Sequence, residues 1–168
     1  MAIDDELFRA VFSAHPAAVC VVTAAGPDDV PSGLTTSAVT AVSMEPPLLL
    51  VCVGTESRTL AALRHSGGFA VNFLAAHNER LSDRFAGKST QKFAGLAWRP
   101  SERAAGAPLL PARHLSAVAE CRVHQEVPAG DHSVFLGRVE GAAVHGRAPM
   151  LYHERAYLNL PAPALAGP

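Results

Sequence analysis

The chain has 168 residues, of which 49% are hydrophobic and 17% are charged, and its formal net charge is −1. This composition is typical of one globular domain with a substantial core, and it excludes a disordered chain. Lys and Arg form no long run, which argues against a nucleic-acid partner, because such a surface needs clustered cations.

No apolar stretch reaches membrane-spanning length, since the longest, at 48–53, has the size of a strand. The N-terminus, MAIDDELFRA, is acidic where a secretory signal is basic and then apolar. We therefore expect a cytoplasmic protein without a membrane partner. Cys20, Cys52 and Cys121 lie in apolar runs without metal-ligand spacing, which predicts reduced, buried thiols.

The first third of the chain combines one short helix with several strands. Asp4 and its acidic neighbours favour the start of an amphipathic helix, and Pro16 stops it. Pro46 and Pro47 separate two extended segments. We predict a helix over 4–14, a buried strand over 17–25, a turn at 26–29, an extended segment over 30–44 and a strand over 48–54.

The remaining elements are also short, except for two long strands near the end. Ser57 is expected to cap a helix through Leu63, with Gly67 after its end. We then predict a strand over 69–75, a helix over 77–87, a loop over 99–114, strands over 115–127 and 133–144 joined by a turn at 128–132, and a loosely ordered tail over 161–168. Many short strands with few helices favour a mainly antiparallel barrel over a doubly wound sheet.

Several familiar motifs are absent from the sequence. It contains no GxGxxG, GxxxxGK[ST] or GxSxG, so the usual dinucleotide, P-loop and esterase signatures are missing. It also lacks HExxH and Cys-x-x-Cys, and we therefore expect no metal.

Three groups of polar residues interrupt apolar segments. The hydroxyls of 35–40 allow a ligand to approach the backbone closely, although an ordinary Thr-rich strand has the same pattern. Residues 57–59 (Ser-Arg-Thr) suit an anion at a helix N-terminus, or simple capping. Asn72 in a strand needs hydrogen-bond partners, which are either backbone groups or the edge of a heterocycle.

Two further positions are candidates on weaker local grounds. Lys92 and Phe93, near Arg84, supply a cation and an aromatic surface, or alternatively a solvated helix face. His132 stands in a glycine-containing turn, where it either reaches a ligand or is inert.

Taken in order, six segments resemble the flavin reductase family with the FMN-binding split-barrel fold. They lie at 33–53, 57–60, 69–75, 84–93, 130–140 and 149–157, and together they cover most of the chain from Phe8 to Leu160. The resemblance implies a mainly β fold, an antiparallel split β-barrel with a few short flanking helices. That domain would occupy 1–160 and be followed by a flexible C-terminal tail at 161–168.

The nearest relatives implied are the reductase components of two-component flavin monooxygenases. In these enzymes NADH or NADPH reduces a non-covalently bound FMN or FAD, and a separate oxygenase receives the reduced flavin. Hydride transfer belongs to the two cofactors, so the protein acts mainly by positioning them. The resemblance also implies a homodimer with each flavin near the subunit interface.

The resemblance assigns roles to individual residues. The flavin ring and ribityl chain would contact Thr35, Thr36, Ser37 and Ala38, and the phosphate end would contact Ser57, Arg58 and Thr59. The isoalloxazine would also contact Asn72, Phe73 and Leu74, while Ala86, Gly87, Lys92 and Phe93 would close the site. His132 matches the histidine of the family's GDH motif, which is associated with nicotinamide binding, and it is the candidate catalytic residue; Tyr152 and Tyr157 are further candidates nearby.

The sequence departs from the family pattern at Met44-Glu45, where an aliphatic residue and Asp are common, and in a less basic ending at 155–159. Two alternative functions remain open at this point. One is another split-barrel flavin oxidase, resembling pyridoxamine-phosphate oxidases, which needs a basic cluster for a second phosphate that the sequence lacks. The other is a non-catalytic flavin-binding module.

Overall fold

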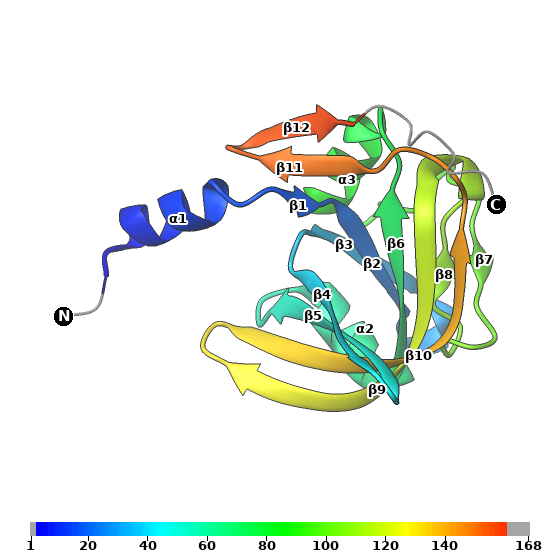
Figure 1. Cartoon of the computed structure of the whole chain (residues 1–168). Helices are drawn as coiled ribbons and strands as arrows, with labels where there is room; N and C mark the ends of the chain where they lie inside the picture. The colour runs from blue at the N-terminus through cyan, green and yellow to red at the C-terminus, as the bar shows by residue number, and fades with distance from the viewer. Residues whose placement is uncertain (1–2, 161–168) are drawn as a thin grey trace.

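The computed structural model describes residues 3–160, and its centre is a seven-stranded antiparallel sheet. The strand order is β3-β2-β6-β9-β10-β5-β4, and the strands curve around a common interior (Figure 1). The strands are β2 (Cys20–Ala25), β3 (Pro31–Thr36), β4 (Val39–Met44), β5 (Pro47–Gly54), β6 (Gly68–Leu74), β9 (Leu115–Ala129) and β10 (His132–Val144).

The connection between β3 and β4 explains why this sheet forms a barrel. These two strands are the opposite edges of the sheet, yet only Ser37 and Ala38 separate them in the chain. Because two residues span a short distance, the two edges must meet at this end. They do not pair with each other along their length, so the barrel stays open on one side. The predicted antiparallel split barrel is confirmed.

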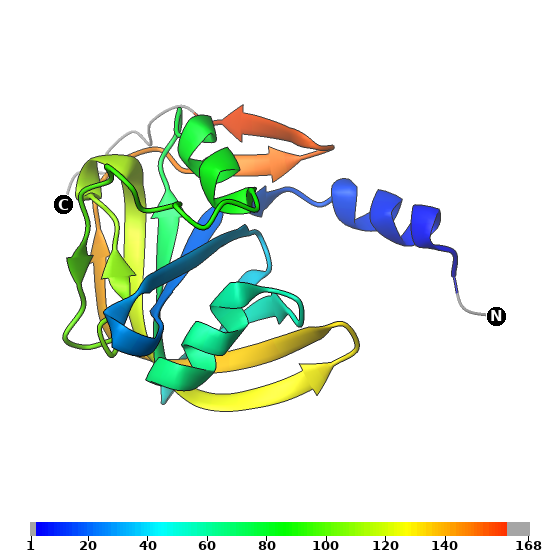
Figure 2. The ribbon, with the colours of Figure 1, turned by 180° about the vertical axis from the view of Figure 1, so that it is seen from behind.

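Three helices accompany the barrel, as expected. Helix α1 (Asp5–Ser13) is capped by Asp4, whose carboxylate accepts a hydrogen bond from the Leu7 N–H, and it projects away from the barrel (Figures 1 and 2). Helix α2 (Arg58–Ser66) is capped by Ser57 and ends at Gly67 in the left-handed conformation. Helix α3 (Glu79–Ala86) ends at Gly87. The sequence therefore located all three helices, with α2 running slightly further than predicted.

The long hairpin of β9 and β10 has a tighter turn than predicted. His132 pairs with Ala129, so only Gly130 and Asp131 lie between the strands. Gly130 has a φ of 62°, a conformation that glycine adopts without steric cost. Beyond Arg122, β9 no longer pairs with β6, and this end of the hairpin projects from the barrel as an arm (Figure 1).

Five short strands and two single turns of 3-10 helix complete the described part of the fold. The small sheet formed with the two strands after β10 was not predicted, and the segment 99–114, predicted to be a loop, contains a two-stranded ribbon. The tail predicted at 161–168 lies outside the described residues. The additional elements are β1 (Ala17–Ala18), β11 (Met150–His153) and β12 (Ala156–Asn159) in the small sheet, β7 (Arg99–Pro100) and β8 (Pro108–Leu109) in the ribbon, η1 (Pro27–Asp29) and η2 (Ala112–His114).

The barrel interior is apolar and closely packed. Leu60 and Leu63 of α2 join Phe69, Phe135 and other buried side chains in one cluster. A Cβ on Gly137 would overlap the ring of Phe69, so glycine is required there. The three cysteines are free; Cys20 and Cys121 are buried, as predicted, and Cys52 is half-buried. Burial raises the pKa of Cys20 and of Cys121 to about 12.

No helix within residues 3–160 is long and apolar enough to cross a membrane.

Candidate functional site

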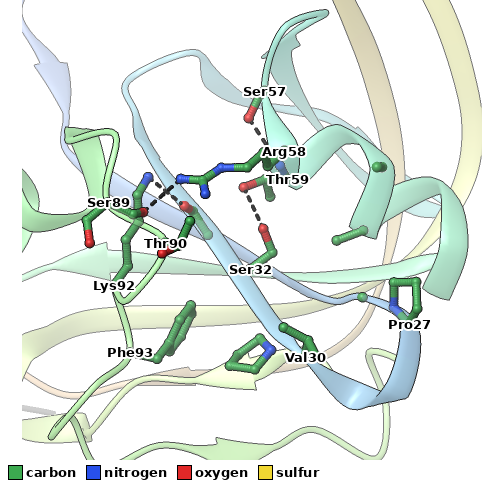
Figure 3. Close-up of a pocket in the computed structure, with 15 residues that line it drawn as sticks. Pro27, Val30, Ser32, Ser57, Arg58, Thr59, Ser89, Thr90, Lys92 and Phe93 are labelled. Carbon is green, nitrogen blue, oxygen red and sulfur yellow. Dashed lines mark hydrogen bonds between the residues drawn. The ribbon is translucent and has the colours of Figure 1, made fainter.

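A cavity of about 330 Å³ opens beside the N-terminus of α2 (Figure 3). We call it the anion pocket. It lies between α2, β3 and the loop that follows α3. Its lining consists of Gly26, Pro27, Val30, Pro31, Ser32, Gly33, Ser57, Arg58, Thr59, Ala61, Ala62, Ser89, Thr90, Lys92 and Phe93.

Hydroxyl groups hold the N-terminus of α2 against β3. The Ser57 Oγ accepts a hydrogen bond from the Thr59 N–H at 3.3 Å, which caps the helix. The Thr59 hydroxyl lies 3.1 Å from the Ser32 hydroxyl, so the first turn of α2 is fixed near the start of β3 (Figure 3). Peptide N–H groups at a helix N-terminus favour an anion.

Two cations complete the anion pocket. The Arg58 Nη2 donates to the carbonyl oxygens of Lys88 and Ser89 at 2.7 and 2.8 Å. The Lys92 Nζ donates to the carbonyl oxygens of Gly33 and Phe85 at 3.1 and 2.6 Å. Burial, and secondarily the charge of Arg58, lower the pKa of Lys92. No acidic residue lines this pocket in the described part of the chain, so its chemistry favours a phosphate.

A second cavity, of about 230 Å³, lies near the other end of β3, and we call it the tyrosine pocket. The rings of Tyr152 and Tyr157 are 5.4 Å apart at 60°. The Tyr157 hydroxyl lies 2.7 Å from Asp83 Oδ1. Desolvation raises the pKa of Tyr157. The Thr35 hydroxyl donates to the Ser82 carbonyl at 2.6 Å. The full lining is Val19, Thr35, Thr36, Ser37, Ser82, Ala86, Tyr152 and Tyr157.

Strand β3 connects the two pockets. Ser32 and Gly33 line the anion pocket, whereas Thr35 and Thr36 line the tyrosine pocket. At about 3.3 Å per residue, Ser32 and Thr36 are about 13 Å apart. The site therefore suits an elongated ligand with an anionic group at one end and a polar ring at the other.

A third hollow, the α1 groove, separates α1 from the barrel and has a volume of about 700 Å³. Ser37, Ala38 and Tyr152 line it on the barrel side, and Phe8 and Phe12 line it on the helix side. Ser37 and Tyr152 also line the tyrosine pocket, so the two hollows adjoin.

His132 lies at the tip of the hairpin arm, directly after its turn, and lines none of these three hollows. Its Nδ1 is 2.7 Å from the Asp131 carboxylate, a contact that lowers the pKa of Asp131. His132 pairs with Gly54 on β5, and a Cβ on Gly54 would lie 3.7 Å from the His132 Nε2. Two residues earlier on β5, the Cys52 N–H donates to the Ala38 carbonyl. Through β5, His132 therefore lies near Ala38, which lines the α1 groove.

The side chain of Asn72 is fully enclosed by the protein. Its amide donates to the Val21 carbonyl at 3.1 Å and to the Thr23 hydroxyl at 3.2 Å, and its oxygen accepts from the Leu110 N–H at 3.0 Å. Of the two kinds of partner open from the sequence, protein groups are those observed. Phe73 and Leu74 belong to the hydrophobic clusters, and none of these three residues lines a described hollow.

The end of α3 and the loop that follows it contribute differently from one residue to the next. Ala86 lines the tyrosine pocket, while Gly87 ends α3 without lining any of the three hollows. Lys92 points into the anion pocket from this loop rather than from a solvated helix face (Figure 3). Phe93 forms the floor, with its ring centre 5.0 Å from that of Phe85.

Four hydroxyl residues that line the pockets were not predicted from the sequence: Ser32, Ser82, Ser89 and Thr90. Ser89 and Thr90 lie inside the segment 84–93 that carries the family resemblance, so their position beside Lys92 was an available signal. Nothing local distinguishes Ser32, since its contact with Thr59 joins residues 27 positions apart.

Comparisons with known proteins agree with this geometry. The model of the flavin reductase like domain family matches residues 12–161, and the chain therefore belongs to that family. The resemblance inferred from the sequence is confirmed.

Within the family, the chain is similar to several flavin reductases over most of its length. It is 42% identical to a flavin reductase (NADH) of Kitasatospora aureofaciens, over 95% of this chain and 83% of that protein. It is 37% identical to HsaB of Mycobacterium tuberculosis, a flavin-dependent monooxygenase reductase subunit, over 94% of this chain and 83% of that protein. Its fold matches the Streptomyces globisporus NADH:FAD oxidoreductase SgcE6 in complex with NAD and FAD fragments, with a TM-score of 0.86, 34% identity and coverage of 98% and 99% of the two chains.

Proposed function

We propose that this protein is an NAD(P)H:flavin oxidoreductase that reduces FMN or FAD and supplies the reduced flavin to a partner monooxygenase. The observation that carries this proposal is the anion pocket. Two cations, a helix N-terminus and several hydroxyls meet there, no carboxylate among residues 3–160 lines it, and β3 leads from it to the tyrosine pocket. The names of the relatives from Kitasatospora aureofaciens and Mycobacterium tuberculosis support the reaction and the partner.

In this proposal, the residues that line the two pockets contact the flavin directly, and other candidates act from outside them. Ser57, Arg58, Thr59 and Lys92 hold the flavin phosphate. Thr35, Thr36, Ser37 and Ala38 accompany the ribityl chain and the ring, with Ala86, Tyr152 and Tyr157 on the facing wall. Gly87 and Phe93 support the loop that closes the site. Asn72 acts on the site indirectly, by joining β6 to β2 and to Leu110.

The chain acts by binding and orienting its two ligands. When bound, the flavin and the nicotinamide supply the hydride-transfer chemistry themselves. Arg58 and Lys92 neutralise the phosphate charge, and β3 determines how far the ring lies from that phosphate. Asp131 holds the His132 Nδ1, which leaves Nε2 available to hydrogen-bond the nicotinamide.

The proposal includes a homodimer, because two apolar surfaces lack a partner within the described chain. Leu7, Phe8, Val11 and Phe12 of α1 are 53 to 62% exposed. Leu49, Val51 and Val53 face the barrel interior, so their neighbours Leu48, Leu50 and Cys52 point outward, next to Val134 and Leu136 of β10. A second copy that covered both surfaces would remove this apolar area from water.

A panel of two nicotinamides against three flavins tests the proposal. Purified protein is mixed with NADH or NADPH and with FMN, FAD or riboflavin, and the loss of absorbance at the nicotinamide band is followed. We expect turnover with at least one nicotinamide, and weaker saturation by riboflavin, which lacks the phosphate. Flavin binding without nicotinamide oxidation would instead identify a non-catalytic flavin-binding module.

A further inference from the structure

The anion pocket continues past its two cations onto an apolar surface. Pro27 and Val30 line this surface (Figure 3), together with Pro31 at the start of β3 and Ala61 of α2. We call these four residues the apolar shelf. The Val30 side chain is 60% exposed, so the shelf is accessible to a ligand.

The shelf lies on the opposite side of the cations from the tyrosine pocket. Along β3, Thr35 and Thr36 line the tyrosine pocket, Ser32 contacts the first turn of α2, and Pro31 begins the strand next to Val30. At about 3.3 Å per residue, Val30 is about 7 Å beyond Ser32 and about 20 Å from Thr36. The order along β3 is therefore ring pocket, phosphate-binding groups and apolar shelf.

FMN and FAD differ in how much of this series they occupy. FMN ends at its phosphate, so an FMN with its ring at Thr36 leaves the shelf uncovered. FAD continues through a second phosphate to an adenosine, whose flat purine packs well on proline and aliphatic side chains. Arg58 and Lys92 supply one cation for each phosphate of the FAD diphosphate. On this basis, and resting on the proposed function, we propose that the protein prefers FAD over FMN and binds the adenosine of FAD on the shelf.

The adenosine of NADH has the same chemistry and is the other possible occupant. Binding of oxidised flavin without any nicotinamide separates the two sources, because only FAD can then place an adenosine on the shelf. The second measurement is the Michaelis constant for NADH with FMN as the acceptor. Because FMN has no adenosine, a change in this constant reports the adenosine of NADH.

The test uses Ala61→Phe, which fills the shelf with a bulky side chain. His65→Phe is the matched control, because it introduces the same ring on an exposed position one turn further along α2, outside the anion pocket. Affinities for oxidised FAD and FMN are measured by titration calorimetry. We expect the wild-type protein to bind FAD about tenfold more tightly than FMN, a difference of ~1.4 kcal/mol. Ala61→Phe should abolish that difference while changing the FMN affinity less than about twofold, and His65→Phe should preserve it.

A second variant guards against misfolding of the first. Val30→Asn removes apolar contact area without adding charge, and Val144→Asn is its control on an exposed valine that lines none of the three hollows. We expect about a threefold loss of FAD affinity for Val30→Asn and no change for the control.

Three results would overturn the inference: equal wild-type affinities for FAD and FMN, parallel losses of both flavins in the shelf variants, or a raised Michaelis constant for NADH in Ala61→Phe. The last result would assign the shelf to the nicotinamide dinucleotide. Continued reduction of FMN by NADH would leave the proposed function intact in each case, so the two proposals fail separately.

Discussion

Two polar clusters in this protein look alike in the sequence and differ in the structure. Asn72 lies between β2 and Leu110, where its amide nitrogen and oxygen both have protein partners. Arg58 and Lys92 also donate hydrogen bonds to backbone carbonyls. However, both hydrogen bonds of Arg58 come from a single guanidinium nitrogen, and the Lys92 ammonium has three N–H donors but only two carbonyl acceptors. A ligand site is found where donors outnumber the acceptors that the protein supplies.

The comparison predicts that Asn72 contributes to stability and not to ligand affinity. Asn72→Ala leaves the Leu110 N–H without its acceptor inside the core and should lower the free energy of unfolding by about 3 kcal/mol. Urea unfolding measures this loss. Asn159→Ala, at an exposed asparagine, should cost less than about 1 kcal/mol. A tenfold weaker flavin affinity with normal stability would place Asn72 in the site instead.

Arg58 is expected to show the opposite behaviour. Arg58→Ala should raise the Michaelis constant for FMN about 30-fold, or ~2 kcal/mol, because a charged hydrogen bond to phosphate is lost. The constant for riboflavin should stay unchanged, since riboflavin has no phosphate. Arg64→Ala, which removes a cation of the same helix that is paired with Glu126, is the control. Equal losses for FMN and riboflavin would contradict a phosphate contact.

His132 combines features of both clusters, because Asp131 occupies its Nδ1 while its Nε2 remains available. We expect His132→Ala to raise the Michaelis constant for the nicotinamide about tenfold and to change the affinity for oxidised flavin less than about twofold. His124→Ala, on the exposed part of the same hairpin, serves as the control. Similar losses of nicotinamide and flavin affinity would rule out the nicotinamide role.

Lys92 sharpens the comparison through the pH dependence of binding. Its pKa is lowered by burial, so its ammonium loses its proton below the usual lysine value of about 10.4. Phosphate binding needs the charged form, and FMN affinity should therefore fall several-fold as the pH rises through the lowered pKa of Lys92. Lys92→Arg should flatten this profile, because arginine stays protonated. The profile is measured as the Michaelis constant for FMN between about pH 7 and pH 10. A wild-type profile that matches that of Lys92→Arg would exclude titration of Lys92.

The sequence predicted the elements whose signals are local. Asp4 and Ser57 cap their helices and Gly67 ends α2, each through contacts within a few residues. The pairing of β11 with β12 was not predicted, because strands of four residues leave little pattern to recognise.

The candidate site was predicted only in part, because some of its contacts join residues that are far apart in the sequence. Thr35, Arg58 and Lys92 were found through family motifs, and the structure places each beside a pocket. The partners of Asn72 lie 38 to 51 positions away, so local sequence could not distinguish a satisfied amide from one that faces a ligand.

Helix α1 has a consequence for the energetics of the whole protein. None of its nine residues is buried within the described chain, and a helix of this length is marginal in water without packing. In the proposed homodimer, packing against the second copy would supply this order, and mass action would then link it to protein concentration. Since Phe8 and Phe12 share a groove with Ser37 and Tyr152, dilution of the enzyme should loosen this wall of the ligand site before the barrel itself unfolds.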